Sequence, residues 1–278
     1  MHELRQQYPI AGLLKVAGLA RSTFYYQLGV LTAGNKHSEV AATIKAVFDR
    51  HKGRYGYRRI TAAIRQLGKR INHKTVQRLM GELKLKSLVR PKKYKSFRGE
   101  VGQAAPNELN RQFEAPAPNE KWVTDVTEFK VAGEKLYLSP VLDLYNGEIV
   151  AFEMNRRPPF ELVTSMLTKA FSRLSPTDRP MLHSDQGWQY RMTAYRQMLK
   201  ERGMMQSMSR KGNCHDNAAM ESFFGVLKSE FFYLNKFASV DQLETGIADY
   251  IHYYNHDRIK LKLGGLSPVQ FRTQQAAA

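Results

Sequence analysis

The 278-residue sequence has one cysteine, Cys214, and lacks the runs of about 18 apolar residues from which membrane-spanning helices are built. A single thiol excludes a disulfide within the chain and a cysteine-rich zinc site. The amino terminus also lacks the charged and then apolar layout of a secretion signal. We therefore expect a folded cytoplasmic protein that does not interact with membranes.

Acidic residues are nearly absent from residues 50–98, which contain seventeen Lys and Arg and one acid, Glu82. The formal charge of the whole chain is +18, so this segment holds nearly all of the excess. Dense charge of one sign is typical of polyanion binding, because contacts with phosphates release condensed counterions. A merely solvated surface usually mixes both signs. The charge pattern therefore favours a nucleic acid as the partner.

The first 35 residues predict two short helices within Ile10–Tyr26, separated at Gly18, with the second opened by Ser22. Two helices joined by a tight turn form a helix-turn-helix pattern. A plain helical hairpin that packs on the next domain fits this segment equally well. We assign no contacts with DNA bases to residues 1–35.

A second helical unit, residues 36–90, shows clearer periodicity, with helices expected over residues 39–50, 57–67 and from the cap Asn72 onward. The third helix has an apolar inner stripe and a polar outer face, as in a recognition helix that enters a DNA major groove. A module that binds only phosphates is the alternative. The candidate DNA contacts of this unit are Arg58, Arg59, Lys74, Gln77 and Arg78.

Residues 91–120 show neither helical nor strand periodicity, and glycines and prolines are scattered through them. They predict a linker between two domains. The start of the linker is basic, and we expect Lys92, Lys93 and Lys95 to lie along a DNA backbone.

From Lys121 onward the pattern changes to short strands that later alternate with helices. Strands are expected over residues 122–131, 136–144, 148–154, 181–185 and 204–207, and helices over residues 160–174, 193–202, 216–232 and 240–256. Asn146-Gly147 is the hairpin signal between the second and third strands. This order predicts an α/β core in residues 121–235, with a mixed five-stranded sheet flanked by helices, and a helical C-terminal extension in residues 236–278.

Three carboxylates on separate elements are the candidate catalytic and metal-binding residues. Asp125 is expected in the middle of the first strand, where an unpaired charge is costly to bury. Asp185 is expected at a strand end and Glu221 near the start of a helix. Acids that converge at one end of a sheet suit Mg²⁺ or Mn²⁺, which prefer oxygen ligands. We interpret Asp143 as polar support at a strand end and Asp216 as a helix N-cap.

The segments around these acids resemble a known family. Trp122–Asp125, His183–Gly187 and Asp216–Glu221 are similar to the three acidic motifs of bacterial insertion-sequence transposases with a retroviral-integrase-type catalytic core. Thirty-five residues separate the second acid from the third, the spacing that gives this group its D,D(35)E name. Lys228 matches the basic residue seven positions after the glutamate.

Two further segments resemble the same transposases. Tyr55–Ile60 is similar to part of the helical module that precedes their core, and Tyr254–Asn255 with Leu266–Pro268 is similar to their tail. The resemblance covers residues 36–272. It implies a ribonuclease H-like core that performs phosphoryl transfer on DNA, cleaving strands at the ends of an insertion sequence and transferring these ends into target DNA.

The resemblance also implies roles for individual residues. The first acid, Asp125, would bridge two Mg²⁺ or Mn²⁺ ions, and the other two acids would hold one ion each. Lys228 would contact a DNA phosphate at the end of the element. His183 and Asn217 would line the pocket near the DNA, and a hydrogen-bonded structural histidine fits His183 equally well.

The implied partners are double-stranded DNA molecules, namely the terminal repeats of the element and the target, bound by a homo-oligomer of the chain. Such elements often encode a separate upstream reading frame that is fused by frameshifting, and this chain could be the downstream product alone. The implied location is the nucleoid in the bacterial cytoplasm.

Two other functions fit part of the sequence. A metal-dependent nuclease of the same fold would cleave DNA without strand transfer. A DNA-binding regulator without catalysis would explain the basic segment and both helix-turn-helix patterns. Three spaced acids argue against the regulator, because carboxylates repel the DNA that such a protein must approach.

Overall fold

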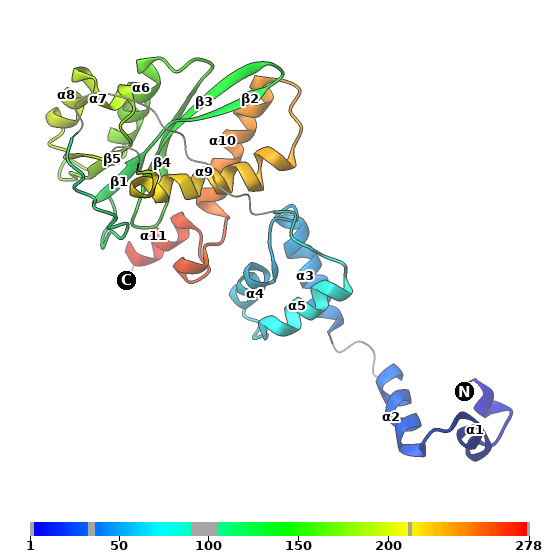
Figure 1. Ribbon diagram of the computed structural model, residues 1–278. Coiled ribbons are helices and arrows are strands. Elements are labelled where there is room, and N and C mark those ends of the chain that lie inside the picture. The colour runs from blue at the N-terminus through cyan, green and yellow to red at the C-terminus, as the bar shows by residue number, and fades with distance from the viewer. Residues whose placement is uncertain (1–2, 33–36, 90–104, 211–212, 277–278) are drawn as a thin grey trace.

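The computed structural model describes residues 3–32, 37–89, 105–210 and 213–276. Along the chain it contains a pair of short helices, a three-helix unit and a mixed sheet covered by helices, in that order from the blue to the red end in Figure 1. The first part of the predicted linker, residues 91–104, lies outside the described residues, and it includes the candidate DNA contacts Lys92, Lys93 and Lys95.

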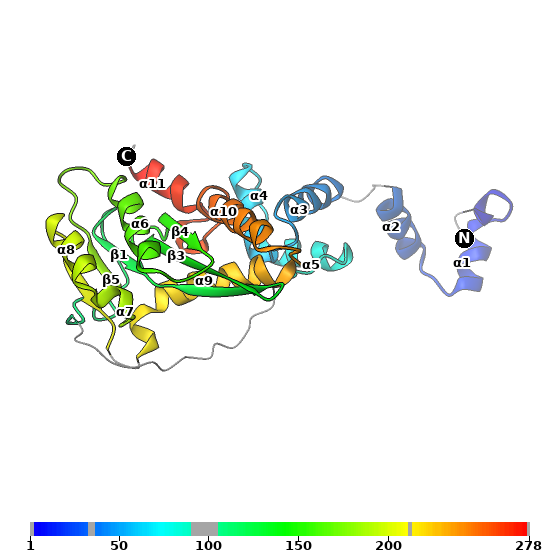
Figure 2. The same cartoon turned by 90° about the horizontal axis from the view of Figure 1, so that it is seen from above.

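The N-terminal elements are η1 (Leu4–Gln6), α1 (Ile10–Ala17) and α2 (Arg21–Thr32). Helix α1 ends at Gly18, whose φ of 61° is a left-handed conformation that glycine adopts without strain. The predicted sequence of helix, turn and helix is confirmed. Figures 1 and 2 both show this pair of helices away from the other elements.

The three-helix unit consists of α3 (Ser38–Arg50), α4 (Tyr57–Gln66) and α5 (His73–Glu82). Asn72 caps α5, because its side-chain oxygen accepts a hydrogen bond from the backbone N of Lys74 at 2.9 Å. The buried core of the unit contains Ile44, Val47, Tyr55, Ile60, Ala63, Ile64, Val76, Leu79 and Met80. Ile259, from the far end of the chain, also belongs to this core.

The central sheet has six strands among the described residues. They are β1 (Lys121–Thr124), β2 (Thr127–Val131), β3 (Glu134–Asp143), β4 (Ile149–Asn155), β5 (Met181–Ser184) and β6 (Gln206–Met208). Strand β3 pairs antiparallel with β1, β2 and β4, whereas β5 pairs parallel with β1 and β6. The sheet is therefore mixed, as predicted.

Strands β1 and β2 correspond to the single first strand predicted over residues 122–131. Both pair with β3, β2 along residues 134–138 and β1 along residues 141–143, on the edge opposite β4. The strand breaks at Asp125, whose Oδ1 accepts a hydrogen bond from the backbone N of Val126 at 2.7 Å. The expected mid-strand position of Asp125 is therefore wrong, since it directly follows β1. The six observed strands therefore lie in the five predicted segments, because the first segment contains both β1 and β2.

Helices cover both faces of this sheet (Figure 1). They are α6 (Phe160–Phe171), α7 (Trp188–Arg191), α8 (Thr193–Glu201), α9 (Ala218–Glu230) and α10 (Val240–His256), with the short η2 (Cys214–Asn217) and η3 (Phe232–Leu234) on either side of α9. Trp122 packs with α6 and α8, whereas the next residue, Val123, packs with α9 and α10 on the opposite face. Within the described residues, no helix has the length and apolar character of a membrane span.

The C-terminal elements are η4 (Leu261–Leu263) and α11 (Pro268–Ala276), which was not predicted. Arg272 on α11 forms ion pairs with Asp143 and Glu148. Asp143 is fully buried at the end of β3 and also accepts hydrogen bonds from the backbone N of Asn119 and of Tyr145, each at 3.0 Å. These contacts agree with the interpretation of Asp143 as strand-end support.

Candidate active site

The ends of β1 and β5 bring two of the predicted acids to one edge of the sheet. The two strands are parallel neighbours, with Val123 opposite His183. Continuing this register places Asp125 beside Asp185, each directly after the last residue of its strand. The carboxyl ends of parallel strands are the usual place for a ligand in an open α/β sheet.

Gly187 shapes the loop that follows β5. Its backbone N–H donates to Asp185 Oδ1 at 2.9 Å. A Cβ atom at position 187 would lie 2.9 Å from the same oxygen and 2.7 Å from the side chain of Gln189. A larger residue at this position would require the side chains of Asp185 and Gln189 to shift.

The third acid lies on α9, whose start is tied to β1. Asn217 precedes the helix and donates from Nδ2 to the carbonyl oxygen of Thr124 at 3.1 Å. Thr124 is the last residue of β1, so this bond brings the first turn of α9 next to Asp125. Glu221 lies in this first turn and is half-buried. Its predicted place near the start of a helix is confirmed.

The charges of the three acids influence one another. Burial and the nearby charge of Asp185 raise the pKa of Asp125 well above its usual value, and the charge of Glu221 adds to this effect. Burial also raises the pKa of Asp185, while a backbone hydrogen bond and the charge of Arg191 oppose the rise. Negative carboxylates that lie close together and are partly shielded from water repel one another. A nearby cation favours their ionised forms. Sequence reasoning missed Arg191, because the short helix α7 leaves no periodic pattern.

The donor chemistry of three carboxylates fits a hard divalent cation such as Mg²⁺. Their side chains do not form a closed site, since within the described part of the chain no group of three or more His, Cys, Asp or Glu could hold a metal ion. Asp125 and Asp185 each turn one oxygen toward a backbone amide of their own loop. Each carboxylate has a second oxygen that takes no part in these two bonds.

Asp216 does not cap α9, and this prediction is wrong. It lies in η2, its side chain is fully buried, and its oxygens accept hydrogen bonds from the side chains of Arg210, Arg111 and Asn107 at 2.8–2.9 Å. The hydrogen bonds from Arg210 hold the pKa of Asp216 well below its usual range. The capping position is occupied by Asn217, which makes no side-chain cap bond. Asp216 therefore anchors the loop before α9.

His183 and Asn217, both expected to line the DNA pocket, are buried. The Nδ1 atom of His183 lies 2.8 Å from Ser207 Oγ, and its Nε2 atom lies 3.0 Å from Ser209 Oγ. Burial lowers the pKa of His183 to about 4, so the ring is neutral at pH 7. A ring with both nitrogens bonded inside the protein fits the structural alternative for His183. Contact of His183 and Asn217 with DNA stays a prediction.

Lys228 lies on α9, seven residues after Glu221. Its Nζ atom donates to Thr127 Oγ1 at 2.7 Å and lies 5.2 Å from the centre of the Phe129 ring. Burial lowers the pKa of Lys228, and the negative charge of Asp125 opposes this shift. The amine is therefore close enough to Asp125 for their charges to interact, and its contact with a DNA phosphate stays a prediction.

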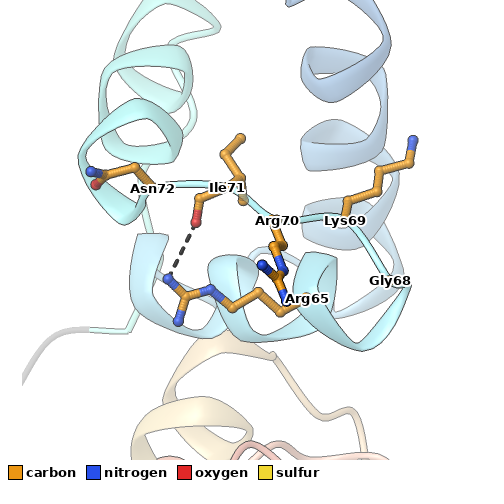
Figure 3. A pocket seen from close by; sticks show the side chains of 6 residues that line it. All are labelled: Arg65, Gly68, Lys69, Arg70, Ile71 and Asn72. Atoms are coloured by element: carbon orange, nitrogen blue, oxygen red, sulfur yellow. Dashed lines mark hydrogen bonds between the residues drawn. The ribbon is translucent and has the colours of Figure 1, made fainter.

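The surface of the three-helix unit carries other predicted DNA contacts. Lys74, Gln77 and Arg78 are among the exposed residues of α5, as expected. A cavity of about 650 Å³ lies at the turn before α5 and is lined by Arg65, Gly68, Lys69, Arg70, Ile71 and Asn72. Figure 3 shows Arg65 reaching from α4 toward this turn, where it donates to the carbonyl oxygen of Ile71 at 3.2 Å. Positive charge near a helix N-terminus favours phosphate binding.

Arg58 and Arg59 are adjacent on α4, but they face different surroundings. Arg58 is exposed. Arg59 Nη1 forms an ion pair with Glu230 Oε1 at 3.0 Å, and the expected DNA contact of Arg59 stays a prediction. Sequence reasoning missed Glu230 and its second partner, Arg258, because the three residues are far apart in the chain.

Comparisons with known proteins agree with this architecture. Family models described as an integrase core domain match residues 115–214 and 221–275, and a model described as an HTH-like domain matches residues 36–93. InsK, a transposase for insertion sequence element IS150 of Escherichia coli (strain K12), is 55% identical over 274 residues, which cover 99% of this chain and 97% of InsK.

Two other matches extend the comparison. A transposase-like protein of Haemophilus influenzae is 57% identical over 205 residues, which cover 74% of this chain and 94% of that protein. A chain in the cryo-EM structure of the simian T-cell lymphotropic virus intasome in complex with PP2A regulatory subunit B56 gamma is 17% identical, with a TM-score of 0.49 over 83% of this chain and 74% of that chain.

The predicted ribonuclease H-like core and helix-turn-helix unit are confirmed by the two kinds of matching domain. The identity to InsK extends over nearly the whole length of both chains. The chain therefore belongs to the family of bacterial insertion-sequence transposases that carry an integrase catalytic core.

Proposed function

We propose that Asp125, Asp185 and Glu221 are the catalytic acids with which this transposase cleaves the ends of its element and joins them to target DNA. The observation that carries the assignment is the register of β1 and β5, which sets the two aspartates side by side. Glu221 supports it, because its charge is close enough to raise the pKa of Asp125.

The three acids would hold two Mg²⁺ or Mn²⁺ ions, which supply activation of a water or 3′-hydroxyl and stabilisation of the leaving oxygen. Asp125, whose pKa is raised by the charges of both other acids, would contact both ions, and Asp185 and Glu221 would contact one each. Gly187 keeps the loop close to Asp185, and Asn217 holds the start of α9 against β1.

We expect Mg²⁺ or Mn²⁺ to support cleavage and joining, and Ca²⁺ to permit assembly on DNA with little chemistry. Ca²⁺ prefers longer bonds and looser geometry than phosphoryl transfer with two metal ions requires. The measurement is cleavage of a labelled element end at matched concentrations of each ion, with EDTA as the control. Equal turnover in Ca²⁺ would contradict the assignment of the acids to metal binding.

A transposase joins cleaved element ends to target DNA, whereas a nuclease with the same fold only cleaves. Incubation of the protein with pre-cleaved element ends and a supercoiled target should yield joined products. Cleavage without joined products would support the nuclease alternative.

The Lys228→Ala variant should bind element ends more weakly and retain chemistry at high protein concentration. Loss of one phosphate contact lowers the slope of log affinity against log salt by about 0.9. Electrophoretic binding at several salt concentrations measures this slope. Lys130→Ala removes an exposed lysine on β2 and is the control, with an unchanged slope expected. An unchanged slope for Lys228→Ala would place its amine away from the DNA backbone.

The proposal includes the partners of the reaction. The exposed basic face of α5 and the cavity beside it would bind the terminal repeats, and the acids would act on these and on target DNA. Both ends of the element must be joined to the target DNA. We therefore propose that copies of the chain assemble on DNA in the bacterial cytoplasm. A protein from an upstream reading frame is a further proposed partner.

A further inference from the structure

Glu230 is the last residue of α9, the helix that carries Glu221, and its side chain is only 3% exposed. Arg258 donates to both carboxylate oxygens, from Nε at 2.8 Å and from Nη2 at 2.7 Å. The hydroxyl of Tyr250 donates to Oε2 at 3.0 Å. The carboxylate of Glu230, at the end of a core helix, is thus held by two residues of the C-terminal extension, residues 236–278.

The three-helix unit, residues 37–89, holds the same residue from the other side. Arg59 Nη1 lies 3.0 Å from Glu230 Oε1. Arg54 Nε donates to the backbone carbonyl oxygen of Glu230 at 3.0 Å. The Arg54 guanidinium also lies 4.7 Å from the centre of the Tyr253 ring on α10. Both the side chain and the main chain at the end of α9 are therefore bonded to the DNA-binding unit.

Further contacts near Glu230 join the three-helix unit to the C-terminal extension. We call the whole set of contacts between the three-helix unit and the rest of the chain the attachment. The backbone N of Ile259 donates to the hydroxyl of Tyr55 at 2.8 Å, and the side chain of Ile259 is buried in the core of the three-helix unit. Gln66 Nε2 donates to the carbonyl oxygen of Gly265 at 2.7 Å. The attachment combines buried apolar area with hydrogen bonds to charged groups, which are stronger than neutral ones.

We propose that Arg54, Arg59 and Glu230 are positioning residues, which fix the recognition helix α5 relative to Glu221 so that a bound element end reaches the acids. The inference rests on the proposed roles of α5 and Glu221. Glu230 and Glu221 are nine residues apart on one helix, a rise of about 13.5 Å at 1.5 Å per residue. A rigid helix of this length carries an orientation set at Glu230 directly to the active site.

Adjacent arginines offer a matched test. Arg58 is exposed on α4, and its Nε donates only to the hydroxyl of the neighbouring Tyr57 among the bonds described for it, whereas Arg59 is bound to Glu230. Arg58→Ala should weaken binding of an element end and lower the salt slope by about 0.9, with unchanged cleavage by bound complexes. Arg59→Ala should change affinity less than about threefold, because its guanidinium is used within the protein.

In bound complexes, Arg59→Ala should lower the cleavage rate about 10- to 100-fold, the usual scale for a displacement of ~1 Å at a reacting centre. Arg59→Lys, which keeps the charge near Glu230, should restore part of this rate. The assay uses the full chain, a labelled element end, Mg²⁺ and protein well above the dissociation constant, so that binding and cleavage are measured separately. Lys45→Ala, at an exposed pair on α3, is the control for a surface change.

A second readout needs no DNA. The amide of Ile259 donates across the attachment, so its hydrogen exchange should become at least about tenfold faster in Arg59→Ala. Loss of binding and of salt slope with normal cleavage by bound complexes would instead make Arg59 a DNA contact. Faster cleavage by Arg59→Ala would mean that the attachment restrains cleavage, which contradicts the proposal. Unchanged hydrogen exchange at Ile259 would mean that Arg59 does not stabilise the attachment. An inactive wild-type protein would count against the proposed function, while exchange at Ile259 would still test the attachment.

Discussion

The Glu221→Gln variant should bind element ends normally and lose strand cleavage and joining by at least ~100-fold, the scale for removal of one group that stabilises charge in a transition state. Gln has nearly the size and helix propensity of Glu, so α9 should stay intact. The change removes the negative charge with which Glu221 is proposed to hold a metal ion next to Asp125. Electrophoretic binding and a Mg²⁺ cleavage assay on the same labelled DNA measure both effects.

Asp216→Asn is the matched comparison, because Asp216 precedes Glu221 by five residues and also carries a carboxylate. Its carboxylate forms ion pairs with Arg111 and Arg210. The variant should therefore lower the thermal midpoint of unfolding. Folded Asp216→Asn protein should still cleave DNA. Normal cleavage by Glu221→Gln together with an inactive, folded Asp216→Asn protein would show that the third acid has been misassigned.

The sequence predicted the order of strands and helices in the catalytic core and the three helices of residues 36–90, because apolar periodicity reflects which side of each element is buried. It did not reveal the break between β1 and β2. The break depends on the bond from the backbone N of Val126 to Asp125 Oδ1, a choice of one side-chain rotamer that alternation cannot indicate.

Asp216 shows a second limit. Its residue type and place before a helix fit an N-cap, and these are local properties. Its actual partners include Arg111 and Asn107, more than a hundred residues earlier in the chain. Such a pairing depends on how the loop before β1 returns to the start of α9, which a local pattern does not contain.

The adjacent residues Arg58 and Arg59 show the same limit in the three-helix unit. In sequence they are equivalent basic residues in a basic segment. Neighbouring side chains on a helix point about 100° apart, so one faces solvent and the other faces Glu230. Predicting this difference requires the position of α9 relative to α4, which only the folded chain provides.

The Glu230→Gln variant should lose about 3–5 kcal/mol of stability, because it leaves the buried guanidinium of Arg258 without its charged partner. For a chain of this size the loss corresponds to a fall in thermal midpoint of roughly 6–20 °C. The matched control is Glu82→Gln, which removes an exposed carboxylate paired with Arg78 and should change stability by less than about 0.5 kcal/mol. Calorimetry of the three proteins measures the difference.

The loss of unfolding free energy caused by Glu230→Gln should also be smaller at acidic pH. Burial favours the protonated form of Glu230, but hydrogen bonds and charge from Arg258, with the charge of Arg59, lower its pKa to about 2. The folded-state pKa lies below the unfolded value of about 4.3, so the stabilisation is complete above that pH and is lost as pH falls toward 2. The difference between wild type and variant in urea unfolding should therefore narrow by about 2 kcal/mol between pH 6 and pH 3. A constant difference over this range would mean that the charge of Glu230 does not stabilise the attachment, and that its hydrogen bonds act equally well when it is neutral.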